Sequence, residues 1–138
     1  MRTDYRLFAA VLAPLLLVWW VPPWSAVIFR EGLTGALVFS ISVAVLEEVV
    51  FRGGIQGWLR QKAVFHLKLF GFSRANWVTS LLFACAHAWQ HPLGLVPGYL
   101  AVSLVLGHFR DHYNGIRVPL ALHLYYNLAL LFLSLLAR

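Results

Sequence analysis

The chain has 138 residues, of which 61% are hydrophobic and only 12% are charged, and its formal net charge is +6. So few charged residues cannot cover a soluble globule of this length, and the composition therefore predicts an integral membrane protein. The positive charge does not indicate nucleic acid as a partner, because the lysines and arginines lie between apolar runs rather than in one dense patch. Cys85 is the only cysteine, which excludes an internal disulfide and any C-x-x-C motif, and we expect it to be a buried packing residue.

The first apolar segment spans about 7–21 and follows Arg2 and Arg6. It ends in a Trp-rich and Pro-rich stretch typical of a membrane interface, without a convincing small-residue cleavage site. Because further apolar segments follow it, we expect a retained transmembrane helix rather than a cleaved signal peptide. The second apolar segment begins near Gly32 and extends to about Leu59.

A basic stretch at 60–74 follows, in which lysine, arginine and histidine are interleaved with phenylalanine and leucine. We expect this stretch to lie on the membrane surface rather than to cross it. Three more apolar segments span about 76–90, 93–109 and 116–137. The sequence thus predicts an all-α polytopic membrane protein, a helical bundle of about five transmembrane segments with a basic interfacial stretch. No repeat or linker divides it, so we expect one domain over residues 1–138.

Positive residues are divided unequally between the two sides of this arrangement. One side carries Arg2, Arg6, Arg60, Lys62, Lys68, Arg74, Arg110 and Arg117. The other side carries Arg30 and Arg138. Because positive residues favour the cytoplasmic side of a membrane, we expect the amino terminus in the cytoplasm.

Two adjacent glutamates and an arginine interrupt the second apolar segment. Ionisable groups at membrane depth cost roughly 2.5 to 3.5 kcal/mol each on insertion scales, so they usually form pairs, line a wet cavity or take part in chemistry. On a helix, Glu48 and Arg52 are four residues apart in the favourable order for an ion pair. Glu47 then has no partner on its own helix, which makes it a candidate general base. The alternative is that both glutamates are solvated at a helix end.

Two other apolar segments carry polar side chains at similar depths. Counting from the segment boundaries at about 1.5 Å per residue puts Glu47 and His123 each roughly 9 Å from the inner edge of the hydrocarbon core, and His87 roughly 16 Å from it. Asn127 follows His123 by one helical turn. In one assignment, Glu47 and His87 hold and deprotonate a water. His123 and Asn127 then donate hydrogen bonds to the oxyanion that forms when this water attacks a carbonyl.

Each of these polar residues also has a structural interpretation. A single histidine in an apolar helix is often a hydrogen-bonded packing residue, and Asn127 alone is more typical of an interhelical hydrogen bond. His87 and His91 have the i, i+4 spacing of a metal pair, but the chain contains no His-Glu-x-x-His string. The common depth of Glu47, His87 and His123 favours one shared site.

Three strings on separate apolar segments follow in one order: Glu47-Glu48-x-x-x-Arg52-Gly53, Phe83-x-x-x-His87 and His123-x-x-x-Asn127. They resemble the three signature motifs of the CAAX protease and bacteriocin-processing family, also called the Abi family. The resemblance covers about residues 32–138. It implies an intramembrane endopeptidase, now usually regarded as glutamic-type, in which Glu47 and His87 activate water. His123 and Asn127 are assigned to the oxyanion, and Glu48 and Arg52 support the site.

The resemblance also implies a substrate, a location and a size relation. The substrate would be a membrane-embedded or lipid-anchored protein or peptide, cut near its carboxyl-terminal region, and the location would be a bacterial inner (plasma) membrane. We expect no cofactor, although a divalent metal at Glu47, His87 and His123 stays open. The chain is shorter than most relatives, so part of the usual helical surround is missing or comes from another subunit, which makes a homo-oligomer one arrangement. In size it resembles the small bacterial members that process carboxyl-terminal sorting anchors.

Two other classes of function remain open. A non-catalytic membrane binding protein, such as a bacteriocin-immunity factor or a chaperone-like partner, would work with both Glu47 and His87 replaced. An ion or proton carrier would use Glu47, His87 and His123 as a relay, but it needs ionisable residues in both halves of the membrane. Here these residues cluster in one half, which favours the protease.

Overall fold

The computed structural model describes residues 6–7, 9–11, 25–89 and 91–136. The long elements of this part of the chain are helices: α2 (Ser25–Glu47), α4 (Arg74–Ala88), α5 (Val96–Tyr113) and α6 (Arg117–Leu136). α2 changes direction at Gly32 (φ 70°) and runs on without a loop into the π-helix η2 (Glu48–Gln56) and the short α3 (Gly57–Leu59). The 3₁₀ helices η3 (Ala63–His66) and η4 (Leu93–Leu95) and the strands β1 (Lys68–Leu69) and β2 (Phe72–Ser73) form the connections. The prediction of an all-α fold is confirmed.

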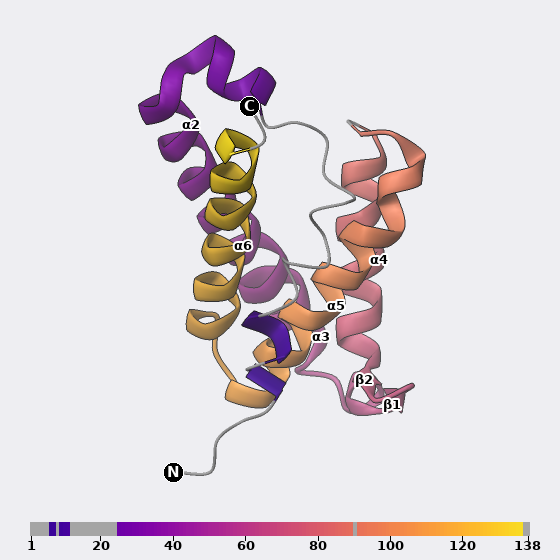
Figure 1. Cartoon of the computed structure of the whole chain (residues 1–138). Coiled ribbons are helices and arrows are strands. Elements are labelled where there is room, and N and C mark those ends of the chain that lie inside the picture. Colours follow the sequence, from indigo (N-terminus) through magenta and orange to yellow (C-terminus); the bar gives the residue numbers. More distant parts are fainter. Residues whose placement is uncertain (1–5, 8, 12–24, 90, 137–138) are drawn as a thin grey trace.

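The helices form two packed pairs with η2 between them (Figure 1). α6 lies beside α2, and α4 lies beside α5. η2 contacts α4, α5 and α6 as well as α2, so both pairs reach the charged stretch that begins at Glu48. Any side chain that points inward from η2 is therefore surrounded by helices.

Polar and apolar side chains are distributed in the reverse of the order expected for a soluble protein. Buried side chains include Glu48, Arg52, Gln56 and Asn76, each with no exposed surface, whereas many large aliphatic side chains lie on the outside. Without water around the helices, the packing of small residues and interhelical hydrogen bonds hold a bundle together. The distribution is that of a protein surrounded by lipid.

Three helical stretches of the described residues are long and apolar enough to cross a membrane: Gly32–Leu59, Leu93–Tyr113 and Arg117–Leu136. Five transmembrane segments are therefore not confirmed. The segment expected at 76–90 forms α4, whose 15 residues span about 22 Å of a roughly 30 Å core. Most of the segment expected at 7–21 lies outside the described residues. The expectation that Cys85 is buried is wrong, because this residue lies on the exposed side of α4.

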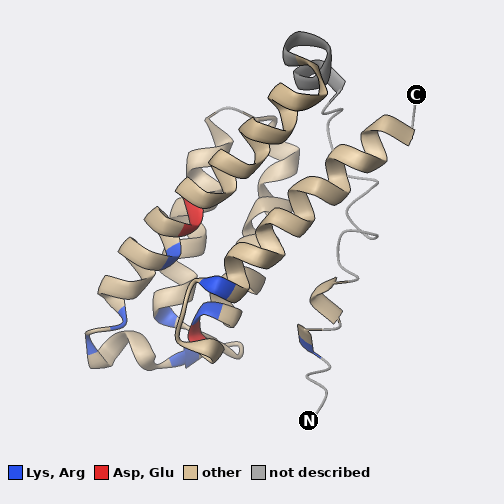
Figure 2. Ribbon diagram, turned by 90° about the vertical axis from the view of Figure 1, so that its left-hand side faces the viewer, with Lys and Arg blue, Asp and Glu red and all other residues tan. Residues whose placement is uncertain are grey.

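The basic stretch forms a short 3₁₀ helix and a hairpin rather than one continuous helix. β1 and β2 pair as an antiparallel hairpin whose turn residues, Phe70 and Gly71, both have positive φ (51° and 85°). Such two-residue turns match the twist of a hairpin, and Gly71 adopts the conformation without a steric penalty. The side chain of Phe70 is 83% exposed. Figure 2 shows that most lysines and arginines gather at this end of the bundle.

A close approach between α4 and α5 depends on Gly107. The Asn76 amide nitrogen donates to the backbone oxygen of Leu104 at 2.9 Å, which brings the side chain against α5. A Cβ atom on residue 107 would overlap Oδ1 of Asn76. Glycine at this position therefore lets a polar side chain of α4 lie flat on the backbone of α5.

Candidate active site

Glu47, His87 and His123 converge from three different helices. The Glu47 carboxylate, at the end of α2, has Oε1 3.6 Å from Nε2 of His87 on α4 and Oε2 3.5 Å from Nε2 of His123 on α6. Side-chain exposure is 19% for Glu47, 18% for His87 and 7% for His123. The structure thus brings together three of the predicted site residues, in a place that is neither sealed nor fully exposed.

The hydrogen bonds of the two histidines define which ring nitrogen faces Glu47. Nδ1 of His87 lies 2.9 Å from the backbone oxygen of Phe83, and a carbonyl oxygen can only accept. Nδ1 of His123 lies 2.9 Å from Oε1 of Glu48, whose carboxylate is paired with Arg52 and also accepts. Both Nδ1 atoms therefore carry protons, and both Nε2 atoms point at the Glu47 carboxylate.

Glu48 and Arg52 form the predicted ion pair, with Nε of Arg52 3.5 Å from Oε2 of Glu48 and neither side chain exposed. This prediction is confirmed. Arg52 is also held by α5, because its Nη2 donates to the backbone oxygen of Ser103 at 3.1 Å and to its hydroxyl at 2.9 Å. Glu48 therefore connects a buried cation on one side with His123 on the other.

A chain of hydrogen bonds continues from Arg52 into the packed pair of α4 and α5. The Ser103 hydroxyl donates to Ser80 at 3.0 Å, and the Ser80 hydroxyl donates to Oδ1 of Asn76 at 3.0 Å. Every member of this chain is buried. Hydrogen bonds to charged groups are stronger than neutral ones, so this chain of bonds restricts the positions of its members.

Phe83 provides the apolar contacts next to this hydrogen-bond network. Its ring stacks on the imidazole of His87 at 4.3 Å between centroids, and it contacts His123 edge-on at 6.4 Å. The guanidinium of Arg52 lies 5.6 Å from the same ring centroid. Phe83 thereby contacts both histidines of the site and the buried cation.

Asn127, which the sequence places with His123, has a different partner. Its amide nitrogen donates to the backbone oxygen of Ser40 on α2 at 3.3 Å. Ser40 precedes Glu47 by seven residues, so the amide is directed along α2 and away from the carboxylate. The contact is an interhelical hydrogen bond between α6 and α2.

Sequence reasoning did not identify Ser80, Ser103 or Tyr99 as neighbours of the site. The two serines hold Arg52 through hydrogen bonds, and Tyr99 packs against His87 with ring centroids 4.4 Å apart. Small polar residues in an apolar segment are ordinary helix contacts in membranes, so no sequence signal separates these from others. Only the pairing of α4 with α5 shows where they lie.

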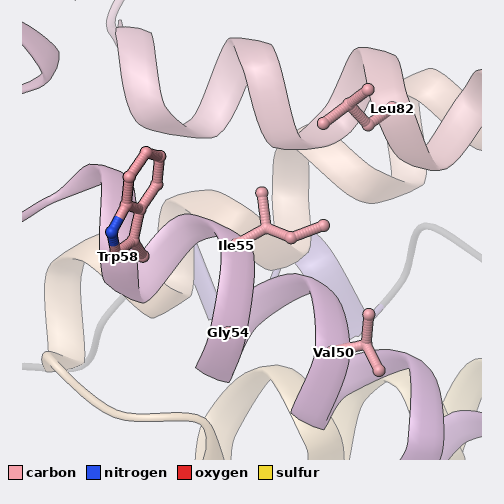
Figure 3. A pocket seen from close by; sticks show the side chains of 5 residues that line it. All are labelled: Val50, Gly54, Ile55, Trp58 and Leu82. Carbon is pink, nitrogen blue, oxygen red and sulfur yellow. The ribbon is translucent and has the colours of Figure 1, made fainter.

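An apolar hollow of about 570 Å³ lies beside the site rather than in it. Val50, Gly54, Ile55, Trp58 and Leu82 line it (Figure 3). None of them carries a group that could take part in acid–base chemistry. In the described residues, no group of three or more His, Cys, Asp or Glu side chains is arranged to hold a metal ion.

Comparison with known proteins identifies a matching family. The model of the type II CAAX prenyl endopeptidase Rce1-like family matches residues 7–129. Searches of curated proteins and of solved structures found no match. The matched range contains Glu47, His87, His123 and Asn127 and covers most of the chain. The resemblance inferred from the three motifs is therefore confirmed, and with its apolar helices the chain is an integral membrane protein that belongs to the type II CAAX prenyl endopeptidase Rce1-like family.

Proposed function

We propose that the protein is an intramembrane endopeptidase that cuts a membrane-embedded or lipid-anchored protein or peptide near its carboxyl-terminal region. The observation that carries this proposal is the convergence of Glu47, His87 and His123 from three helices. Family membership supports a protease, and the geometry supports a glutamic-type reaction in which the carboxylate acts directly on water.

The gap between Glu47 and His87 suits a water molecule. The two facing atoms, Oε1 and Nε2, are 3.6 Å apart, which is beyond a direct hydrogen bond. With Nδ1 of His87 bonded to Phe83, the Nε2 of the neutral ring is an acceptor, as is an ionised carboxylate. A water has two protons to donate, so one molecule can satisfy both acceptors and present its lone pairs to a substrate carbonyl.

In the proposed reaction, the water oxygen bonds to the carbonyl carbon while Glu47 takes a proton from it. The carbonyl oxygen becomes an oxyanion, and Nε2 of His123 donates to it when this nitrogen carries a proton. Glu47 then returns its proton to the leaving amide nitrogen as the carbon–nitrogen bond breaks. Glu48 and Arg52 stay outside the bond changes and hold His123 through its Nδ1.

The role of Asn127 as a second donor to the oxyanion stays a proposal. Its amide donates to Ser40 here, so the oxyanion role requires the side chain to turn when substrate binds. The competing role is the hydrogen bond between α6 and α2. The two roles predict different losses of kcat when Asn127 is substituted.

Location, orientation and cofactor use belong to the same proposal. We propose a bacterial inner membrane as the location, as the family resemblance implies. We propose a cytoplasmic amino terminus because the lysines and arginines gather at one end of the bundle (Figure 2). We propose that the reaction needs no metal. We also propose that residues 1–138 form one domain and that a second copy of the chain supplies part of the helices around the site.

The experiment compares protein termini, measured by mass spectrometry, in membranes of cells that express wild type or Glu47→Gln at equal levels. We expect new carboxyl and amino termini with wild type alone, and these identify the substrate. Gln keeps the size of the side chain and removes the base. Identical termini in the two membranes, together with another phenotype that survives in both, would instead indicate a non-catalytic binding protein.

A further inference from the structure

Four rings pack together where α4 ends and α5 begins. Phe83, His87 and His91 follow one another at intervals of four residues, and their rings stack, with centroids 4.3 Å apart for the first pair and 5.9 Å for the second. Tyr99, in the first turns of α5, contacts both histidines, at 4.4 Å for His87 and 5.2 Å for His91. Tyr99 is thus the member that comes from the neighbouring helix.

The imidazole of His87 is held by contacts of two kinds. Its Nδ1–H donates to the backbone of Phe83, which fixes one edge of the ring. Its two closest ring contacts are nearly equal in geometry, with interplanar angles of 29° to Phe83 and 30° to Tyr99. Packed aromatic pairs are stabilised beyond the burial of their area. A ring held by its own helix and by α5 has little freedom to rotate away from Glu47.

We propose that Tyr99 is a positioning residue of this site, whose aromatic ring keeps the His87 imidazole in the orientation in which Nε2 faces Glu47. The expected effect of Tyr99 on cleavage rests on the proposed function, whereas its effect on the orientation of His87 does not. Tyr99 does not need to touch the reacting atoms. It acts through His87, and it also joins the end of α4 to α5 across the turn that contains η4.

The hydroxyl and the ring of Tyr99 have separable roles. The phenol hydroxyl is a separate polar group that can donate and accept hydrogen bonds. The stacking contacts, however, involve the ring alone. Tyr99→Phe keeps the ring and removes the hydroxyl, whereas Tyr99→Leu removes the ring. The two substitutions therefore distinguish positioning by packing from a direct contribution of the hydroxyl.

The first readout is the tautomer of His87, which does not depend on any substrate. The full-length protein is labelled with ¹⁵N-histidine and measured by NMR in lipid nanodiscs at alkaline pH, where imidazoles are neutral, and His87 is assigned by difference from His87→Gln. We expect a single Nδ1–H tautomer in wild type and in Tyr99→Phe. We expect averaged ¹⁵N shifts in Tyr99→Leu, because the ring is then free to sample other orientations.

The second readout is cleavage of the substrate identified by its termini. Small misplacements of a reacting group can cost up to about a hundredfold in rate, so we expect Tyr99→Leu to lower kcat by roughly tenfold to a hundredfold with little change in KM. Tyr99→Phe should stay within about threefold of wild type on the same reasoning. The matched control is Tyr125→Leu, which removes a tyrosine that is 40% exposed on α6 and should leave both readouts unchanged.

Three results would overturn the proposal. One is an unchanged Nδ1–H tautomer in Tyr99→Leu. Another is a loss of cleavage in Tyr99→Phe as large as in Tyr99→Leu, which would assign the effect to the hydroxyl. The third is an equal effect of Tyr125→Leu. If instead Glu47→Gln cleaves like wild type, the proposed function fails while the NMR result still decides the orienting role of Tyr99.

Discussion

Replacing Arg52 by methionine tests whether the buried ion pair holds the site together. Arg52 and Glu48 have no exposed surface, and Arg52 also donates two hydrogen bonds to Ser103. Removing one partner of a buried pair typically lowers stability by about 3–5 kcal/mol, because the remaining charge is left uncompensated. We therefore expect Arg52→Met to lower the free energy of unfolding by about 3–5 kcal/mol.

The matched control is Arg60→Met, which breaks the pair with Asp111 at 3.2 Å where the side chains are 19% and 22% exposed. Because this pair is partly exposed, solvent screens it more than the buried pair, so this variant should lose less stability. The double variant Glu48→Gln, Arg52→Met removes the stranded charge and should be more stable than Arg52→Met alone.

The measurement is the unfolding free energy of the purified protein in mixed detergent micelles, followed by circular dichroism during titration with dodecyl sulfate. Equal losses for Arg52→Met and Arg60→Met would refute the reasoning, as would a double variant that is less stable than Arg52→Met. Either result would mean that the charge on Glu48 does not need its buried partner.

Three further predictions concern packing, Asn127 and metal. Gly107→Ala should destabilise the protein by about 1–3 kcal/mol, since its Cβ would overlap Asn76, whereas Gly94→Ala, with no atom within 4 Å of the new Cβ, should not; equal thermal unfolding midpoints would contradict this. Asn127→Ala should reduce kcat by about 10²–10³, because the proposal makes its amide a donor to the oxyanion, and a loss of less than about tenfold would show that its role is the hydrogen bond to Ser40. Cleavage by purified protein should survive EDTA, and a loss of activity that zinc restores would contradict the metal-free reaction.

Much of the site follows from sequence because its chemistry is costly in a membrane. Glu47, Glu48 and Arg52 are conspicuous in an apolar segment, and similar depths for Glu47 and His123 follow from counting residues along helices. The ion pair of Glu48 with Arg52 follows from their spacing alone. The meeting of Glu47 with both histidines agrees with that reasoning, while the catalytic roles stay predictions.

Other features depend on contacts between distant segments, which spacing cannot show. The i→i+5 pattern of η2 could not be read from the sequence, and π-helical turns are often found at functional sites. The sequence predicts a transmembrane segment at 76–90, but α4 has only 15 residues. Its length depends on where the chain turns before Pro92, which hydropathy does not show. From its spacing, the Asn127 amide can face either the site with His123 or the backbone of α2. Only the packing of α6 on α2 shows that it reaches Ser40.

The central claim is that Glu47 activates the water that cuts the substrate. The most direct measurement is the single-turnover rate of cleavage in proteoliposomes, with wild type and Glu47→Gln at equal amounts of folded protein and with the substrate identified by its termini. Loss of an essential general base predicts a rate at least roughly 10²-fold to 10⁴-fold lower for Glu47→Gln, with an unfolding free energy close to that of wild type. Equal rates for the two proteins would contradict the account, and so would a Glu47→Gln protein that is inactive because it does not fold.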